Sequence, residues 1–217
     1  MDAITSTERR LAVTAIAGSA AFAAVAVVLP VVQGSSYHPA REAIDDLTVG
    51  SGGWAIQAGF GAAALATVAL AVLLRRTIHR AAVGPALLGV AGILRLVLAV
   101  TRHIPDGRTQ TTASSVHAAA GGLSMVVTIM AMFALVRAMG RDASWRRYKR
   151  TQLAWSVAAL AVVIVLSPPV VGEAHFGVAQ RVGEAVLFAW TVAMAARPLV
   201  ASDTTEVAAA RLTAAAR

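Results

Sequence analysis

The sequence of 217 residues contains no cysteine, little charge and few aromatic side chains. The absence of cysteine excludes disulfides, cysteine-ligated metal sites and thiol nucleophiles. Charged residues make up only 14% of the chain, whereas a soluble domain carries roughly 25% because its surface must be wetted. Hydrophobic residues account for 58% of the chain instead. We therefore expect lipid, rather than water, to surround most of the protein.

Lysine is also nearly absent, because Lys149 is the single lysine among 19 basic residues. The formal net charge of +8 is typical of a nucleic-acid partner only when the charge covers a soluble face. Here the arginines lie in short loops between apolar runs. The excess of basic residues in the cytoplasmic loops of membrane proteins explains this charge completely. We therefore predict no nucleic-acid binding.

Six apolar runs are long enough to cross the hydrocarbon core, which takes about 20 helical residues. They cover residues 11–32, 53–74, 81–100, 113–136, 153–171 and 176–199. We expect an all-α polytopic membrane protein built as a six-transmembrane-helix bundle. Residues 1–202 would form this single domain, and residues 203–217 would form a cytoplasmic tail, either a short surface helix or a mobile segment.

The basic residues predict one orientation. With the amino terminus inside, fourteen of the 19 basic residues lie on the cytoplasmic side, and the three outer loops hold only Arg41, Arg102 and Arg108. Short cytoplasmic loops carry an excess of arginine and lysine. Six spans then place both termini in the cytoplasm, and we expect a bacterial plasma membrane.

The polar residues within the spans fall in one layer, roughly 5–12 Å below the outer boundary at 1.5 Å per residue. Glu184 is the only carboxylate within any span, and an ionised residue there is normally paired. The simplest arrangement is a cluster of Arg95, Glu184 and Arg181, with His117 and Gln57 completing hydrogen bonds. The predicted site or buried network comprises Gln57, Arg95, His117, Gln180, Arg181 and Glu184.

The predicted outer loops and the start of the second span hold further candidates. Two of these are histidines, which together with carboxylates are common zinc ligands. The secondary candidates are Asp45, Asp46, Trp54, His103, Asp106, Glu173 and His175. Pro39 is also placed to open a short helix through the two aspartates.

Several short motifs resemble a known family. They are Gly53-Trp54 through Phe60, Ile104-Pro105-Asp106, His117, and Gly177 to Glu184 with Trp190. Together they resemble the bacterial membrane family called domain of unknown function 998, from the first outer loop to the end of the sixth helix. One departure is Thr101 to Ile104 before Pro105, where the family tends towards an aromatic residue. The resemblance implies a topology and not an activity.

Three functional hypotheses stay open. The first is binding of a small or lipidic anionic ligand in a pocket of the outer half. The second is an accessory subunit whose buried Arg–Glu–His network fixes the helices. The third is a metal-dependent or acid/base hydrolase at the outer leaflet, with Glu184 as base and ligands from His103, Asp106, His117 and His175. No HExxH spacing or nucleophile elbow occurs, so no metal site, catalytic residue or cofactor is predicted. Membrane lipids are the expected partners.

Overall fold

The computed structural model describes residues 4–104, 111–165, 167, 170 and 172–215, with only the backbone described for residue 173 and residues 201–215. Within these ranges all regular elements are helical and no strand occurs, which confirms the all-α prediction for the described chain. The α-helices are α1 (Ser6–Gln33), α2 (Gly53–Thr77), α3 (Val83–Val100), α4 (Thr112–Arg141), α5 (Lys149–Val165) and α7 (Phe176–Ala215).

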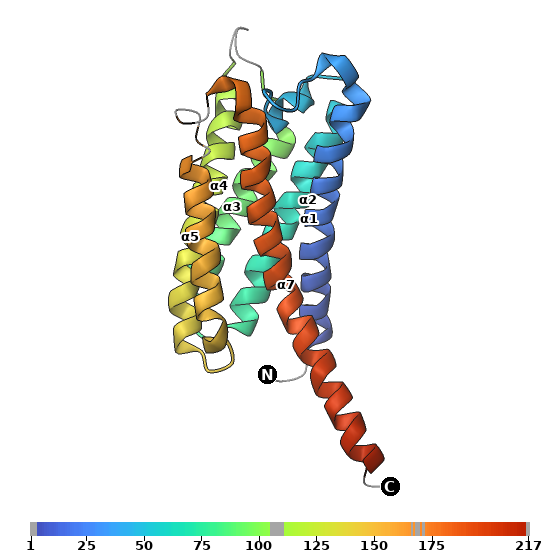
Figure 1. Ribbon diagram of the computed structural model, residues 1–217, viewed down its shortest axis with the longest axis vertical. Coiled ribbons are helices and arrows are strands. Elements are labelled where there is room, and N and C mark those ends of the chain that lie inside the picture. Colours follow the sequence, from blue (N-terminus) through green and yellow to red (C-terminus); the bar gives the residue numbers. More distant parts are fainter. Residues whose placement is uncertain (1–3, 105–110, 166, 168–169, 171, 216–217) are drawn as a thin grey trace.

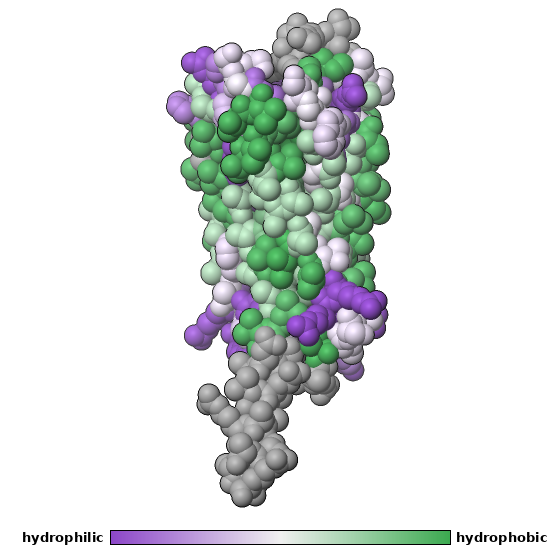
Figure 2. All heavy atoms as spheres, turned by 90° about the vertical axis from the view of Figure 1, so that its right-hand side faces the viewer, coloured by the Kyte–Doolittle hydropathy of each residue, from purple (hydrophilic) through white to green (hydrophobic). Residues whose placement is uncertain are grey.

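Five of these helices are long and apolar enough to cross a membrane. The exception is α5, which has 17 residues and ends where the description of the chain becomes incomplete. A broad apolar surface separates two polar ends on the face shown in Figure 2. The chain is therefore a multi-pass membrane protein. The sixth crossing stays a prediction.

Consecutive helices pack side by side, and α7 closes the bundle against α1, α2 and α5. The start of α1 and the end of α7 lie at the same end of the bundle (Figure 1). We call this end of the bundle the α2–α3 end, because the loop between α2 and α3 lies there. The opposite end holds the loop between α1 and α2, and we call it the α1–α2 end. Beyond residue 202 the backbone continues α7 without a break to Ala215, so the expected separate tail is an extension of the last helix.

Local signals set where the helices begin. Thr5 accepts a hydrogen bond from the backbone N–H of Glu8, whose carboxylate accepts from Thr5 N–H, and this capping box starts α1. The Thr111 hydroxyl caps α4 in the same manner at Ser114. Gly52, with φ +75°, adopts the left-handed conformation directly before α2.

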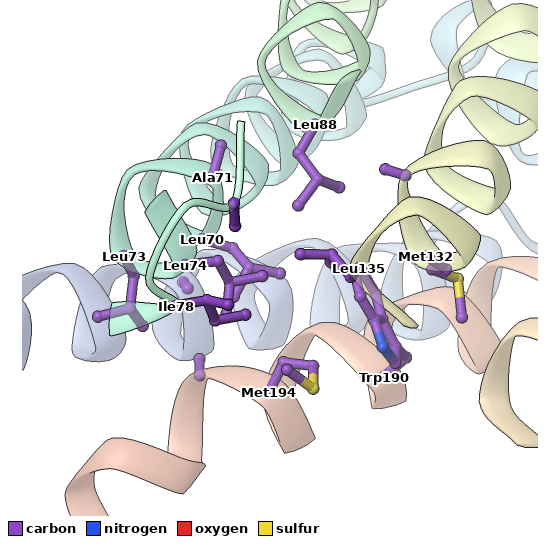
Figure 3. Close-up of a cluster of buried hydrophobic side chains, with 14 of the residues drawn as sticks. Leu70, Ala71, Leu73, Leu74, Ile78, Leu88, Met132, Leu135, Trp190 and Met194 are labelled. Atoms are coloured by element: carbon purple, nitrogen blue, oxygen red, sulfur yellow. The ribbon is translucent and has the colours of Figure 1, made fainter. Parts of the chain in front are cut away.

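The main apolar core fills the half of the bundle near the α2–α3 end. Figure 3 shows leucines from α2, α3 and α4 packed against Trp190 and Met194 of α7. One polar bridge crosses this core. The Gln152 amide donates to Met132 O of α4 at 3.0 Å and accepts from Trp190 Nε1 at 2.9 Å. This residue therefore ties α4, α5 and α7 together without leaving its buried amide unpaired.

The α1–α2 loop (residues 34–52) folds over the α1–α2 end (Figure 1). It contains two short 3₁₀ helices, η1 (Gly34–Ser36) and η2 (Ile44–Thr48). Three side chains of this loop, Tyr37, Ile44 and Leu47, are almost fully buried. The expected short helix through Asp45 and Asp46 therefore exists, but it begins at Ile44 rather than at Pro39. Burial of these apolar side chains holds the loop on the bundle.

Candidate functional site

Arg95 of α3 is the central charge of the site. Its side chain is 4% exposed, and Nη1 donates to the Thr67 hydroxyl of α2 at 2.5 Å. Nη2 lies 3.8 Å from Glu184 Oε2 of α7, close enough for an ion pair. Among the described residues, Nη2 has no hydrogen-bond partner. A buried guanidinium thus keeps donor capacity that its neighbours leave unused.

Aromatic packing completes the surroundings of Arg95. Its guanidinium carbon lies 5.0 Å from the centre of the Phe188 ring, one turn along α7 from Glu184. Phe188 in turn stacks on Phe22 of α1 at 4.8 Å between ring centroids. A ring face stabilises a cation by its quadrupole. The predicted pair of Arg95 and Glu184 is therefore present, and α7 supplies both the carboxylate and the aromatic ring beside Arg95.

His117, in the second turn of α4, is completely buried. Its Nδ1 lies 3.0 Å from the Thr101 hydroxyl and 3.2 Å from Thr101 O at the end of α3. Its Nε2 lies 3.4 Å from Asp45 Oδ1 of η2. The imidazole therefore links a transmembrane helix to the loop that covers it.

Asp45 joins the loop to α7 as well as to α4. Its Oδ2 accepts from Gln180 Nε2 at 3.3 Å, while Gln180 Oε1 accepts from the Ile44 backbone N–H at 2.7 Å. A second pair lies beside this one, because His103 Nε2 is 3.3 Å from Asp46 Oδ1. The rings of His103 and His117 are 5.8 Å apart. The four side chains of these two pairs form one cluster under the loop.

Gln57 contributes at the edge of this cluster. Its amide donates to Thr101 O at 3.5 Å, the same carbonyl that lies near His117. We call the whole set the polar layer. It comprises Asp45, Asp46, Gln57, Thr67, Arg95, Thr101, His103, His117, Gln180 and Glu184.

Arg181 lies apart from the Arg95–Glu184 pair, in contrast to the expected three-membered cluster. Its Nη1 donates to Pro39 O at 2.9 Å, Glu42 O at 3.1 Å and Gly177 O at 2.9 Å, and its Nη2 donates to the Tyr37 hydroxyl. These acceptors belong to the loop and to the first turn of α7. Arg181 therefore fastens the loop rather than neutralising Glu184.

Tyr37 is the other fastening residue. Its hydroxyl lies 2.7 Å from Ala43 O and 3.1 Å from Glu42 O, to which it donates. Burial raises the pKa of this phenol, the nearby Arg181 opposes the rise in part, and Asp46 and Glu42 add to it. The hydroxyl consequently stays a proton donor over the whole ordinary pH range.

Two of the remaining candidates, Trp54 and His175, lie outside the polar layer. Trp54 is 76% exposed, and His175 is exposed in the short helix η4 (Glu173–His175). The Glu173 side chain and the whole of Asp106 lie outside the described residues. The sequence placed Trp54 at the start of the second span and His175 in an outer loop, and neither contacts the polar layer.

The profile of the family described as "Protein of unknown function (DUF998)" matches residues 16–197. The chain belongs to this family. The matched region covers all of the polar layer and the α1–α2 loop. No curated protein matches this DUF998 chain, and no solved structure matches it. The resemblance seen in the sequence is therefore confirmed, and activity must be argued from the site.

The metal ligands considered for the hydrolase hypothesis are only partly assembled in this DUF998 protein. Of His103, His117 and His175, the first two approach each other, whereas His175 is exposed. Across the part of the chain that the structure describes, no three His, Cys, Asp or Glu side chains are grouped to hold a metal ion. The described residues instead form pairs, in which each of His103 and His117 lies beside one aspartate.

The charges of the polar layer form three pairs, Arg95 with Glu184, His117 with Asp45, and His103 with Asp46. Each of the two imidazoles therefore lies beside one aspartate of the α1–α2 loop.

Four residues of the site escaped sequence analysis: Thr67 and Phe188, which flank Arg95, Thr101, which contacts His117, and Tyr37 as a partner of Arg181. Threonine and phenylalanine are ordinary residues of apolar helices, so nothing marked the first three.

Proposed function

We propose that this DUF998 protein crosses the plasma membrane six times with both termini in the cytoplasm. The α1–α2 end then faces outwards, and residues 1–202 form one domain whose last helix extends into a cytoplasmic tail. The distribution of arginine supports this orientation, since fourteen of 19 basic residues belong to the α2–α3 end and its two termini. The common end of α1 and α7 in Figure 1 agrees with an even number of spans.

We propose further that the polar layer binds a small molecule or a lipid headgroup from the outer side. The observation that carries this proposal is Arg95 Nη2, which is buried, lies 3.8 Å from its carboxylate and has no hydrogen-bond partner among the described residues. Unsatisfied buried donors are costly. An anionic oxygen of a ligand would satisfy this donor and strengthen the site.

The neighbouring charges define the ligand more narrowly. A purely anionic ligand on Arg95 would meet Glu184 and, close by, Asp45, which are 18% and 16% exposed. Like charges at such distances repel in a medium of low dielectric constant. A zwitterionic ligand, with an anionic oxygen for Arg95 and an ammonium group for a carboxylate, fits better. Phosphoethanolamine-type headgroups have this chemistry.

The structural alternative has its own support. Asp45 is shared between His117 and Gln180, and Arg181 makes four contacts with the loop and with α7. Such a network fixes the position of helices without any ligand. An accessory membrane protein would use it in that way.

The decisive experiment compares soluble headgroups on the detergent-purified chain. We expect glycerophosphoethanolamine to raise the unfolding temperature by a few degrees at saturation, and glycerol phosphate or ethanolamine alone to have less effect. Arg95→Gln and Glu184→Gln should remove the stabilisation.

Asp45→Asn is the milder variant, because it keeps the shape of the side chain and a hydrogen bond to Gln180. It should fold and bind more weakly. Equal responses of all variants, or no response of the parent protein to any headgroup, would leave the structural alternative standing.

A further inference from the structure

A second polar feature lies at the opposite, α2–α3 end and is independent of the polar layer. Tyr148 closes η3 (Arg146–Tyr148), the short turn before α5. The Arg197 guanidinium of α7 lies 3.9 Å from the centre of its ring, and that of Arg147 lies 4.7 Å away. Two cations from distant parts of the sequence thus share one aromatic ring.

The ring is held in place by its own neighbours. Tyr148 packs against Trp145 with ring centroids 5.9 Å apart, and Trp145 Nε1 donates to Thr77 O at the end of α2 at 2.9 Å. Trp145 is buried in the main core. The Tyr148 ring, which we call the platform under the two arginines, is therefore held rigidly. This rigidity lowers the entropic cost of binding a ligand there.

The positive charge around this platform is not neutralised by a described carboxylate. No ion pair is observed for Arg146, Arg147, Lys149, Arg150 or Arg197 among the side chains that the structure describes. The carboxylate of the nearby Asp142 already accepts hydrogen bonds from other residues. Its Oδ2 accepts from His79 N–H at 2.6 Å, and its Oδ1 accepts from Ser144 and Trp145.

The direction in which the pKa of Asp142 is shifted agrees with these hydrogen bonds. Burial alone would raise the pKa of this carboxyl, but the hydrogen bonds from Ser144, His79 and Trp145 outweigh it and hold the pKa below the usual value. Asp142 is therefore a structural carboxylate of the turn and not a counterion for the arginines.

Arg197 supplies the most specific observation. It lies in the last turns of the apolar part of α7, and its Nε is buried with no hydrogen-bond partner among the described residues. The N–H groups of a guanidinium lie in one plane, and two of them match two oxygens of a phosphate. The arrangement lacks only the acceptor.

We propose that Arg147, Tyr148 and Arg197 form a binding site for the phosphate group of an anionic membrane phospholipid. The site lies at the α2–α3 end, and on the face shown in Figure 2 the apolar surface gives way to hydrophilic side chains near that end. Leu153 and Val157, which are both exposed, follow Tyr148 along α5 towards the middle of the bundle. Acyl chains would pack on these side chains, which favours a lipid over free phosphate.

The test uses the full chain in neutral detergent, titrated with phosphatidylglycerol and observed by native mass spectrometry and thermal unfolding. We expect the double variant Arg147→Gln/Arg197→Gln to bind this lipid about tenfold more weakly. The matched control Arg75→Gln/Arg76→Gln removes two exposed charges at the same end of the bundle and should change binding by less than about fivefold. Equal losses of phosphatidylglycerol affinity in the two double variants would mean that the lipid is held by general charge attraction. That result would overturn the proposed site.

Further variants separate geometry from charge and from folding. Arg197→Lys keeps the charge and should fold, but it loses the planar fork and should bind more weakly. Tyr148→Phe should retain binding and Tyr148→Leu should not. Undiminished binding in both Arg197→Lys and Tyr148→Leu would contradict the proposed stacking.

Two ligand controls identify what is bound. Phosphatidylcholine should bind more weakly because its ammonium group offsets the phosphate. Inorganic phosphate in excess should neither displace phosphatidylglycerol nor stabilise the protein. Equal binding of phosphatidylcholine would remove the anionic preference, and stabilisation by phosphate alone would make this a free-phosphate site instead.

Discussion

At the scale of single residues, burial of charge decided what could be foreseen. Arg95 had to find a carboxylate inside the membrane, and Glu184 was the only one available, so their pairing followed from the sequence. The nearer partner, the Thr67 hydroxyl, could not be foreseen, because threonine also bonds to its own helix and gives no sign of a second contact.

Thr67→Val should therefore lower the stability of the protein more than its small change in size implies. It leaves Arg95 Nη1 without its acceptor, which costs about 1–3 kcal/mol of unfolding free energy. Thr128→Val is the matched control, because the buried Thr128 hydroxyl donates only to Ser124 O of its own helix. Equilibrium unfolding in mixed micelles measures both. Similar losses for the two variants would show that the Arg95 contact contributes nothing.

Tyr37 allows a prediction about pH. Because burial raises the pKa of its phenol in the folded protein, the folded state holds the proton more tightly than the unfolded chain. The stability that Tyr37 contributes is therefore complete below about pH 10 and falls as the pH rises through the folded pKa. Ultraviolet absorbance of a Tyr148→Phe variant, which retains Tyr37 alone, should titrate above pH 10 when folded. A midpoint at or below the value of the denatured protein would contradict this.

At the scale of elements, the α1–α2 loop departs most from what sequence patterns describe. Pro39, the glycines and the two aspartates predicted a turn with a short helix, but they said nothing about its position. The position of the loop depends on Arg181. Its charge suggested Glu184 as a partner, but its guanidinium donates instead to loop carbonyls and to the Tyr37 hydroxyl. Backbone acceptors leave no trace in a sequence, and this explains the error.

Gly177 should be the most sensitive position for loop docking. A Cβ atom there would overlap Glu42 O and Pro39 O, which are backbone atoms unable to move aside cheaply. We expect Gly177→Ala to release the loop and to increase proteolysis or hydrogen exchange between residues 37 and 48 severalfold. Gly122→Ala is the control, since a Cβ there meets nothing within 4 Å. Unchanged protection in Gly177→Ala would mean that the loop is held elsewhere.

At the scale of the whole molecule, the hydropathy of the sequence predicted most of the helices. The apolar runs predicted the helices to within a few residues at most ends, since a lipid environment forces backbone groups to pair within each helix. The end of the last helix was missed. Alanine-rich segments continue a helix readily, so charge alone at residues 203–217 did not stop α7.

The lack of cysteine makes the topology directly testable. Single cysteines at two exposed positions, Ser35→Cys at the α1–α2 end and Arg76→Cys at the α2–α3 end, would be the only thiols in the chain. We expect a membrane-impermeant maleimide to label Ser35→Cys in intact cells, and to label Arg76→Cys only after lysis. The reverse pattern would invert the proposed orientation.

The long reach of the loop contacts has a consequence for biosynthesis. Ile44 and Asp45 bond to Gln180, and Arg95 pairs with Glu184, so each contact awaits the last helix of the chain. During synthesis the first five helices precede it, and until α7 arrives Arg95 lacks its carboxylate while the loop lacks its fastening. Insertion of the final segment thus completes the ion pair and closes the bundle in a single event.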